Sequence, residues 1–221
     1  MKHLFLEGAV QEGKSTLIRR LIQPFLDQTG GFSSQRLLDS SGETVGFRIV
    51  PAAEALELTR EYQADLTGIF LSFQNGKAVK APKLFLETAL QYLNHSDGKK
   101  LILLDEIGGM ELGIPEFREA LYRVLSSSIP CIGVLKLEEK NRHMCEQNVI
   151  DQSCLTWHQV LRRDLKEQFD AQLISFSRKT KTEAEDRIAV FLEQFYRETV
   201  VPSNLLPLLK INSEMPAKSG F

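Results

Sequence analysis

The sequence predicts a three-layer α/β fold with a mostly parallel sheet, and three observations lead to this prediction. Apolar runs of strand length alternate with amphipathic helical segments along most of the 221 residues. The run from Leu101 to Leu104 is continuously apolar, which is typical of a parallel strand covered on both faces. A glycine-rich turn joins the first apolar run to the first helical segment, which is the arrangement of a strand–loop–helix unit.

The periodicity assigns the elements in order. We expect strands at residues 3–7, 32–38, 44–50, 101–105, 131–135 and 172–176. We expect helices at residues 14–28, 83–95, 116–127, 157–169 and 182–198. The turn-forming residues 39–43 separate two extended runs and predict a β-hairpin added to the parallel sheet. The periodicity stops after Val201, so we expect one domain over residues 1–200 and a tail over 201–221 that is loosely ordered or docked.

A complete phosphate-binding loop, G-x-x-x-x-G-K-[ST], follows the first predicted strand. Gly8 and Gly13 let the backbone approach phosphate oxygens, and Lys14 supplies a charge for the β- and γ-phosphates. We expect the Ser15 hydroxyl to be a ligand for Mg²⁺. The dipole of the helix that starts at Lys14 attracts the negatively charged phosphates. The predicted nucleotide-binding residues are Gly8, Ala9, Val10, Gln11, Glu12, Gly13, Lys14, Ser15 and Thr16.

Two carboxylates end the apolar strand at 101–105. Asp105 is the predicted outer partner of Mg²⁺, and Glu106 is the predicted base that orients the water attacking the γ-phosphate. Successive side chains of a strand point to opposite faces, so the chain must bend for both acids to face the phosphates. Gly108 and Gly109 offer the flexibility for that bend.

Composition excludes several other classes of function. The chain is 43% hydrophobic and 25% charged, with a net charge of −2, so it has no general basic surface for nucleic acid or membranes. No apolar run is long enough to cross a bilayer, and the N-terminus enters a strand without an export leader. Three widely spaced cysteines fit a reducing compartment. We therefore expect a cytoplasmic protein.

Residues 104–112, Leu-Asp-Glu-Ile-Gly-Gly-Met-Glu-Leu, resemble the D-E-I-G-x-M-E-L signature of the small nucleoside-triphosphatase family. That family includes the cancer-related nucleoside-triphosphatase and its bacterial and archaeal relatives. The resemblance implies a RecA-like P-loop fold with an additional strand and a catalytic Glu. It also implies Mg²⁺-dependent hydrolysis of ATP, GTP and other nucleoside triphosphates with broad base selectivity.

The chain departs from this family at three places, one of which is the segment 138–170, which is longer than in compact members. Gln11 stands where relatives have glycine, which strains the backbone if its φ is positive. The family has Asn-Arg near the last helix, and this chain has Asp186-Arg187 at the corresponding position. Arg187 is the first candidate for the arginine that stabilises the transferring phosphoryl group, ahead of Arg142 and Arg178. Glu111 belongs to the signature, and we expect it to stabilise the 106–112 loop.

Two alternative functions remain open on the same core. In a nucleoside, nucleotide or small-molecule kinase, an acceptor hydroxyl would replace water, and the enzyme would need an acceptor pocket and a closing lid rich in arginines. The sequence has no arginine-rich segment of this kind, although residues 54–82 could cover the site. An NTP-binding switch would instead order residues 138–170 or the tail for a protein partner of unknown identity. The acid pair at 105–106 favours the hydrolase over the switch.

Overall fold

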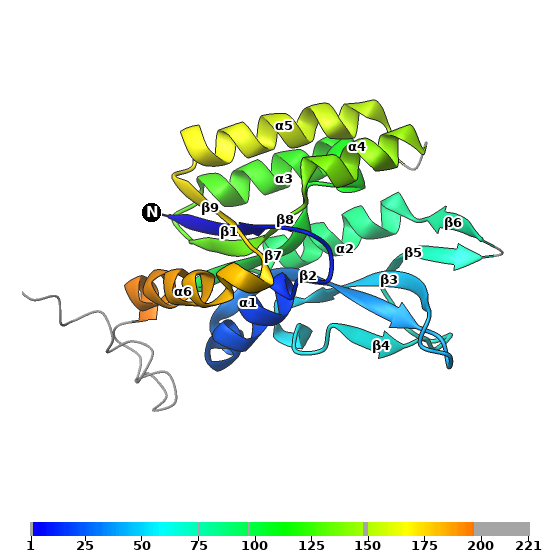
Figure 1. Cartoon of the computed structure of the whole chain (residues 1–221), viewed down its shortest axis with the longest axis horizontal. Helices are drawn as coiled ribbons and strands as arrows, with labels where there is room; N and C mark the ends of the chain where they lie inside the picture. The colour runs from blue at the N-terminus through cyan, green and yellow to red at the C-terminus, as the bar shows by residue number, and fades with distance from the viewer. Residues whose placement is uncertain (1, 75, 97, 148–149, 197–221) are drawn as a thin grey trace, which may run out of the picture.

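The computed structural model describes residues 2–74, 76–96, 98–147 and 150–196. Within these residues nine strands form one sheet, in the order β6-β5-β3-β2-β7-β8-β1-β9, with β4 paired to β2 (Figure 1). The parallel strands are β1 (His3–Glu7), β2 (Thr29–Leu38), β7 (Leu101–Ile107), β8 (Cys131–Leu135), β9 (Ala171–Ser175) and the short β4 (Thr59–Glu61). The antiparallel strands are β3 (Thr44–Pro51), β5 (Ile69–Gln74) and β6 (Lys77–Lys80).

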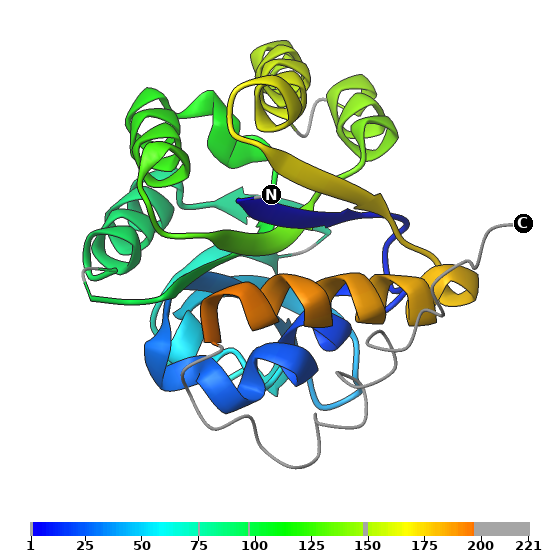
Figure 2. The ribbon, with the colours of Figure 1, turned by 90° about the vertical axis from the view of Figure 1, so that its left-hand side faces the viewer.

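Helices cover both faces of the sheet, and Figure 2 shows the resulting three layers. On one face α1 (Lys14–Ile22) and α6 (Lys181–Tyr196) bury apolar side chains against the inner strands, among them Leu4, Leu6, Ile18, Ile188 and Phe191. On the other face α2 (Pro82–Asn94), α3 (Pro115–Ser126) and α5 (Gln152–Glu167) pack around Phe5, Phe85, Leu104, Phe117 and Leu161. α4 (Glu138–Glu146) lies beside α5. The predicted three-layer α/β fold is confirmed.

Strand β8 lies between β1, which leads into the phosphate-binding loop, and β7, which carries the two acids. This insertion is the additional strand that the family resemblance implies. Gly133 sits at the centre of β8, where a Cβ atom would lie 2.0 Å from the Leu104 carbonyl oxygen. A side chain at this position would therefore collide with the backbone of β7, and only glycine fits.

The predicted β-hairpin is confirmed, because β2 and β3 pair antiparallel. The Asp39 Oδ1 atom accepts hydrogen bonds of 2.9 Å from the backbone N–H groups of Ser41 and Glu43, which closes the turn. The first four residues of β2 also pair parallel with β7. The hairpin therefore extends from the central sheet, and β4, β5 and β6 enlarge the same side.

Several predicted elements differ from those observed. The helix expected at 14–28 ends at Ile22, because Pro24 interrupts its hydrogen bonding and residues 23–28 form a 3₁₀ helix. α5 begins at Gln152 rather than 157, since the Asp151 side chain caps it through Ser153 N–H. α4, β4 and β6 were not predicted, because their polar or exposed sequences carry little apolar periodicity. β5 was not predicted either, although its sequence is largely apolar and its first four residues are half-buried.

The remaining boundaries agree to within a few residues. The predicted tail at 201–221 and the last residues of the helix predicted at 182–198 lie outside the described residues. Among the residues that the structure does describe, every helix is too short or too polar to cross a membrane.

Candidate active site

The phosphate-binding loop connects β1 to α1, as the sequence predicts. Gly13 takes a left-handed backbone conformation with φ of 99° and caps the N-terminus of α1, so Lys14 and Ser15 begin the helix. Gln11 also has a positive φ of 64°, which is the strained conformation that a glycine in its place would relieve. The Glu12 carboxylate accepts a 3.0 Å hydrogen bond from the Arg178 backbone N–H and holds the loop to the segment after β9.

The Lys14 side chain folds back along this loop. Its Nζ atom donates a 2.8 Å hydrogen bond to the Gly8 carbonyl oxygen and another to the Ala9 carbonyl oxygen. Burial lowers the pKa of Lys14, and the nearby Glu106 carboxylate opposes this shift. The ammonium group is thus positioned between the loop and the second acid of β7.

Asp105 is the centre of a buried polar cluster. Its carboxylate accepts hydrogen bonds from Ser15 Oγ at 2.7 Å and from Ser33 Oγ at 2.6 Å. The Arg19 guanidinium forms an ion pair with the same carboxylate at 3.0 Å. Asp105 is only 2% exposed, so burial raises its pKa, whereas the Arg19 charge opposes the shift. The Ser15 hydroxyl and the Asp105 carboxylate form a pair of oxygen donors, which is the kind of ligand that Mg²⁺ prefers.

Glu106 is the point at which β7 bends. Its φ is +61°, and the pairing of β7 with β8 changes register between Leu104 and Ile107. The bend expected from the sequence is therefore present, but it lies at Glu106 itself as well as at Gly108, whose φ is 101°. Because of this bend, Glu106 lines the same pocket as Lys14 and Ser15, whereas Asp105 remains buried.

Three buried side chains hold the loop that follows Glu106. Glu111 lies in a short 3₁₀ helix, η3 (Met110–Gly113), and its carboxylate accepts a 2.6 Å hydrogen bond from the Gly109 N–H. Asn141 Nδ2 of α4 donates to the Gly108 carbonyl oxygen. His158 of α5, which is 0% exposed, places its Nδ1 atom 3.1 Å from the same oxygen. These contacts agree with the loop-stabilising role expected for Glu111.

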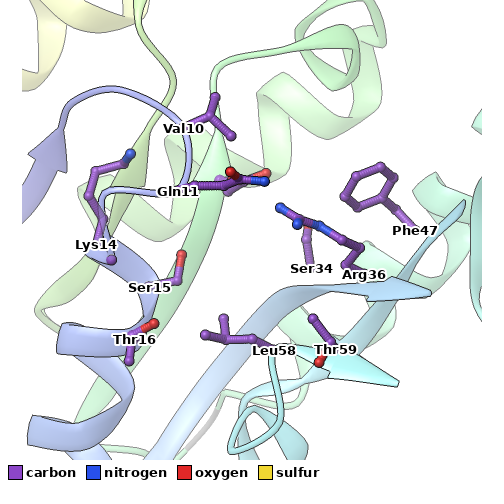
Figure 3. Close-up of a pocket in the computed structure, with 12 residues that line it drawn as sticks. Val10, Gln11, Lys14, Ser15, Thr16, Ser34, Arg36, Phe47, Leu58 and Thr59 are labelled. Atoms are coloured by element: carbon purple, nitrogen blue, oxygen red, sulfur yellow. The ribbon is translucent and has the colours of Figure 1, made fainter. Parts of the chain in front are cut away.

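A pocket of about 220 Å³ opens between the phosphate-binding loop and the outer half of β2 (Figure 3). The loop and α1 contribute Val10, Gln11, Gly13, Lys14, Ser15 and Thr16, and the opposite side consists of Ser34, Arg36, Phe47, Leu58, Thr59 and Glu106. Within residues 54–82, which were considered as a lid, Leu58 and Thr59 reach this pocket. Six of the nine predicted nucleotide-binding residues therefore line one pocket together with Glu106, and Gly8, Ala9 and Glu12 do not line it.

The predicted arginines lie elsewhere. Arg187 lies on α6, where it pairs with Glu183 one helical turn away at 2.8 Å, and it does not line this pocket. Arg142 pairs with Glu138 on α4, and the Arg178 side chain lies 3.9 Å from Glu12. The structure therefore does not bring Arg187, the first candidate, to the residues around Glu106.

Three cations near Glu106 were missed by the sequence interpretation. Lys136 and Lys140 line a small cavity of about 30 Å³ that also contains Glu106 and Lys14. Burial lowers the pKa of Lys140, and Glu106 opposes this shift. Arg36 lines the main pocket from the opposite side. Arg36 lies near the end of β2, Lys136 directly follows β8, and Lys140 lies in the first turn of α4. The carboxyl ends of parallel strands meet at one edge of a sheet, so the positions after β2 and β8 could have indicated these residues.

Comparison with known proteins identifies the chain's relatives. A sequence-family model described as NTPase matches residues 3–169. Nucleoside-triphosphatase THEP1 from Thermotoga petrophila is 31% identical over 135 residues, which cover 60% of this chain and 71% of that protein. Nucleoside-triphosphatase THEP1 from Methanocaldococcus jannaschii is 26% identical over 141 residues, which cover 60% of this chain and 76% of that protein.

Solved structures agree with this assignment at the level of the fold. The solution structure of a human cancer-related nucleoside triphosphatase matches with a TM-score of 0.60 at 18% identity, covering 88% of this chain and 98% of that chain. The crystal structure of THEP1 from Aquifex aeolicus matches with a TM-score of 0.55 at 18% identity, covering 86% and 99%. The NTPase family model matches most of the chain, and the phosphate-binding loop and the acid pair of β7 agree with this match. The chain therefore belongs to the NTPase family of nucleoside-triphosphatases.

Proposed function

We propose that this nucleoside-triphosphatase cleaves the bond between the β- and γ-phosphates of nucleoside triphosphates, using a water molecule that Glu106 orients. The observation that carries this proposal is the meeting of the phosphate-binding loop and the Glu106 carboxylate in one pocket. Lys14 and the backbone N–H groups at the start of α1 would bind the phosphate oxygens. Positioning and electrostatic stabilisation supply most of the rate enhancement in such reactions.

Glu106 has the role of a general base in this proposal. The water oxygen attacks the γ-phosphorus, its proton passes to the Glu106 carboxylate, and the bridging oxygen leaves with the nucleoside diphosphate. The bend of β7 at Glu106 brings this carboxylate into the pocket. Asp105, buried one residue earlier, is too enclosed by Ser15, Ser33 and Arg19 to take the same part.

The residues for a magnesium ion are Ser15 and Asp105. Their oxygens are hard ligands, they lie 2.7 Å apart, and they stand at the start of α1 and the end of β7. When bound, Mg²⁺ neutralises charge that develops on the phosphate oxygens. Asp105 would act mainly on the ion's water ligands, and the Arg19 charge favours the ionised carboxylate against the effect of burial, which raises the pKa of Asp105. We also propose broad base selectivity, as the family resemblance implies.

The test is phosphate release from ATP, GTP, CTP and UTP with Mg²⁺ or with EDTA. Wild-type protein should release phosphate from several triphosphates, and EDTA or Lys14→Ala should remove the release. Lys83→Ala is the matched control, because Lys83 is exposed on α2 and pairs only loosely with Glu87 at 3.9 Å. Nucleotide binding without phosphate release would contradict the hydrolase and favour the kinase or the switch.

A further inference from the structure

The outer half of β2 carries Arg36 to the catalytic end of the sheet. Pairing of β2 with β7 ends at Phe32 and Leu104, and the next residue, Ser33, donates its hydroxyl to Asp105. Side chains alternate along a strand, so Ser34 and Arg36 share the face opposite to Ser33. Both of them line the pocket that contains Glu106.

The residues around Arg36 direct its guanidinium into the pocket. Arg36 is the cross-strand partner of Phe47, whose ring also lines the pocket. The Arg36 backbone N–H donates a 2.9 Å hydrogen bond to the Leu58 carbonyl oxygen, which fixes this part of β2 to the segment before β4. In Figure 3 the Arg36 side chain points across the pocket toward Gln11 of the phosphate-binding loop.

Arg36 differs from the other candidate arginines in its partners. Arg142, Arg178 and Arg187 each have a carboxylate within 4.0 Å. Within the described ranges, no carboxylate lies at ion-pair distance from the Arg36 guanidinium. An arginine that faces a pocket without an acidic partner is available to bind an anion there.

Positive charges outnumber negative charges around Glu106. Lys14, Lys136 and Lys140 line the small cavity beside its carboxylate, Arg36 lines the main pocket, and Lys136 also lies 3.8 Å from the Glu111 carboxylate. The positive charges of Lys136 and Arg36 contribute to lowering the pKa of Lys140, after the larger effect of burial. Four cations near the two carboxylates of Glu106 and Glu111 leave an excess of positive charge, which a multiply charged anion such as a triphosphate neutralises.

We infer that Arg36 is the arginine, supplied by this chain itself, that stabilises the charge on the γ-phosphoryl group during its transfer to water. This inference rests on the proposed function. As the bond to the β-phosphate oxygen breaks and the water oxygen bonds to phosphorus, negative charge spreads over the γ-oxygens. The Arg36 N–H groups donate hydrogen bonds to those oxygens, while Glu106 takes the proton of the water.

The test compares Arg36→Ala and Arg36→Lys with wild type. Arg60→Ala is the matched control, because Arg60 is exposed on the neighbouring β4 and does not line the pocket. Two quantities are measured: the single-turnover rate of phosphate release, and the affinities for MgADP with and without aluminium fluoride, which mimics the transferring phosphoryl group. Circular dichroism and urea unfolding check that each variant is folded.

We expect Arg36→Ala to lower the turnover rate by about 10²-fold or more and to abolish the gain in affinity from aluminium fluoride. Its affinity for MgADP should equal that of wild type, Arg36→Lys should retain an intermediate rate, and Arg60→Ala should match wild type. A folded Arg36→Ala protein with wild-type turnover and wild-type aluminium fluoride binding would overturn the inference alone. Absence of hydrolysis in wild type would instead refute the proposed function. The affinities of wild type and Arg36→Ala for MgADP with aluminium fluoride would still show whether Arg36 binds the group in the γ-phosphoryl position.

Discussion

The Arg19 guanidinium and the Asp105 carboxylate form an ion pair of 3.0 Å in which both side chains are almost completely buried. Arg19 comes from α1 and Asp105 from β7, so this pair joins the helix after the phosphate-binding loop to the strand that carries the acids. The Arg19 Nε and Nη1 atoms have no hydrogen-bond partner among the described residues. The Arg19 charge therefore favours the charged form of Asp105, while burial of the pair carries a considerable cost in desolvation and raises the pKa of Asp105.

We predict that Arg19→Met destabilises the fold by about 3–5 kcal/mol, because it leaves the buried Asp105 carboxylate without its counter-charge. Urea unfolding followed by circular dichroism measures this loss. The double variant Arg19→Met with Asp105→Asn removes both charges and should recover most of the stability. Equal stabilities of the single and double variants would contradict the coupling between the two residues.

Glu106→Gln should lower turnover by about 10²-fold or more while leaving nucleotide affinity unchanged, because the amide cannot accept the proton of the attacking water. Single-turnover phosphate release and calorimetric titration with MgADP measure the two quantities. Glu119→Gln, an exposed acid on α3, serves as the control. Turnover that is the same in Glu106→Gln and wild type would remove Glu106 from the role of base.

The left-handed backbone at Gln11 leads to a prediction about stability. Gln11→Gly should raise the free energy of unfolding by up to about 1 kcal/mol, since glycine adopts a φ of 64° without steric strain. Gln168→Gly should destabilise the protein instead, because Gln168 has an ordinary φ of −110° at the end of α5. Thermal or urea unfolding compares the stabilities of the two variants with that of wild type. A loss of stability in both variants would contradict the backbone strain at Gln11.

His3 makes the stability depend on pH. Its ring accepts a 2.9 Å hydrogen bond from the Cys131 N–H at Nδ1 and lies 3.0 Å from the Leu125 carbonyl oxygen at Nε2, which requires the neutral ring. Burial lowers its pKa from 6.5 to about 4. As the pH falls from 6.5 toward 4, the unfolded chain binds a proton that the native state does not bind. The free energy of unfolding should therefore fall over this range, by at most about 3 kcal/mol from His3.

Urea unfolding at pH 7.5 and pH 5 checks this dependence. His3→Gln should reduce the difference between the two pH values, and His95→Gln should not, because His95 is exposed. Part of the dependence should persist in His3→Gln, because burial also lowers the pKa of His158. A difference that is unchanged by His3→Gln would show that His3 is not responsible.

Asn141 links α4 to the loop that follows Glu106, because its side chain donates to the Gly108 carbonyl oxygen. Asn141→Leu should lower the turnover rate about tenfold or more with little effect on MgADP affinity, because the loop loses its position while the phosphate-binding loop is unchanged. Asn94→Leu, at the exposed end of α2, is the control for the added side chain. A parallel loss of turnover and nucleotide affinity would indicate general unfolding rather than misplacement of Glu106.

The parts of the site that could be predicted are those in which neighbouring residues form a motif. The phosphate-binding loop and the Asp105–Glu106 pair are contiguous, and each follows an apolar strand that the sequence pattern identifies. Arg36, Lys136 and Asn141 belong to no motif, since sheet pairing and helix packing bring them to Glu106 from separate segments. Arg187, which the family resemblance suggested, instead pairs with Glu183 on α6 and does not line the pocket.

The helices and strands also differ in how well the sequence predicts them. The buried strands and the amphipathic helices α1, α3 and α6 were predictable because each has one continuous apolar side to bury. β6 is fully exposed and only four residues long, so its sequence lacks the alternation that indicates a strand. β5 is half-buried over its first four residues, and its apolar run is too short to separate a strand from other structure. The helix α4 is polar nearly throughout, and its one buried residue, Asn141, makes a contact that no periodicity could reveal.

The strand β8 sets the distance between the phosphate-binding loop and the acid pair of β7. Neighbouring strands lie about 4.8 Å apart, so β1 and β7 stand about 10 Å from each other because β8 separates them. That separation is fixed by backbone hydrogen bonds and by the absence of a side chain at Gly133, next to the Leu104 carbonyl. A larger residue there would push β7 away from the phosphate-binding loop, so a position that does not line the pocket sets the spacing between that loop and Glu106.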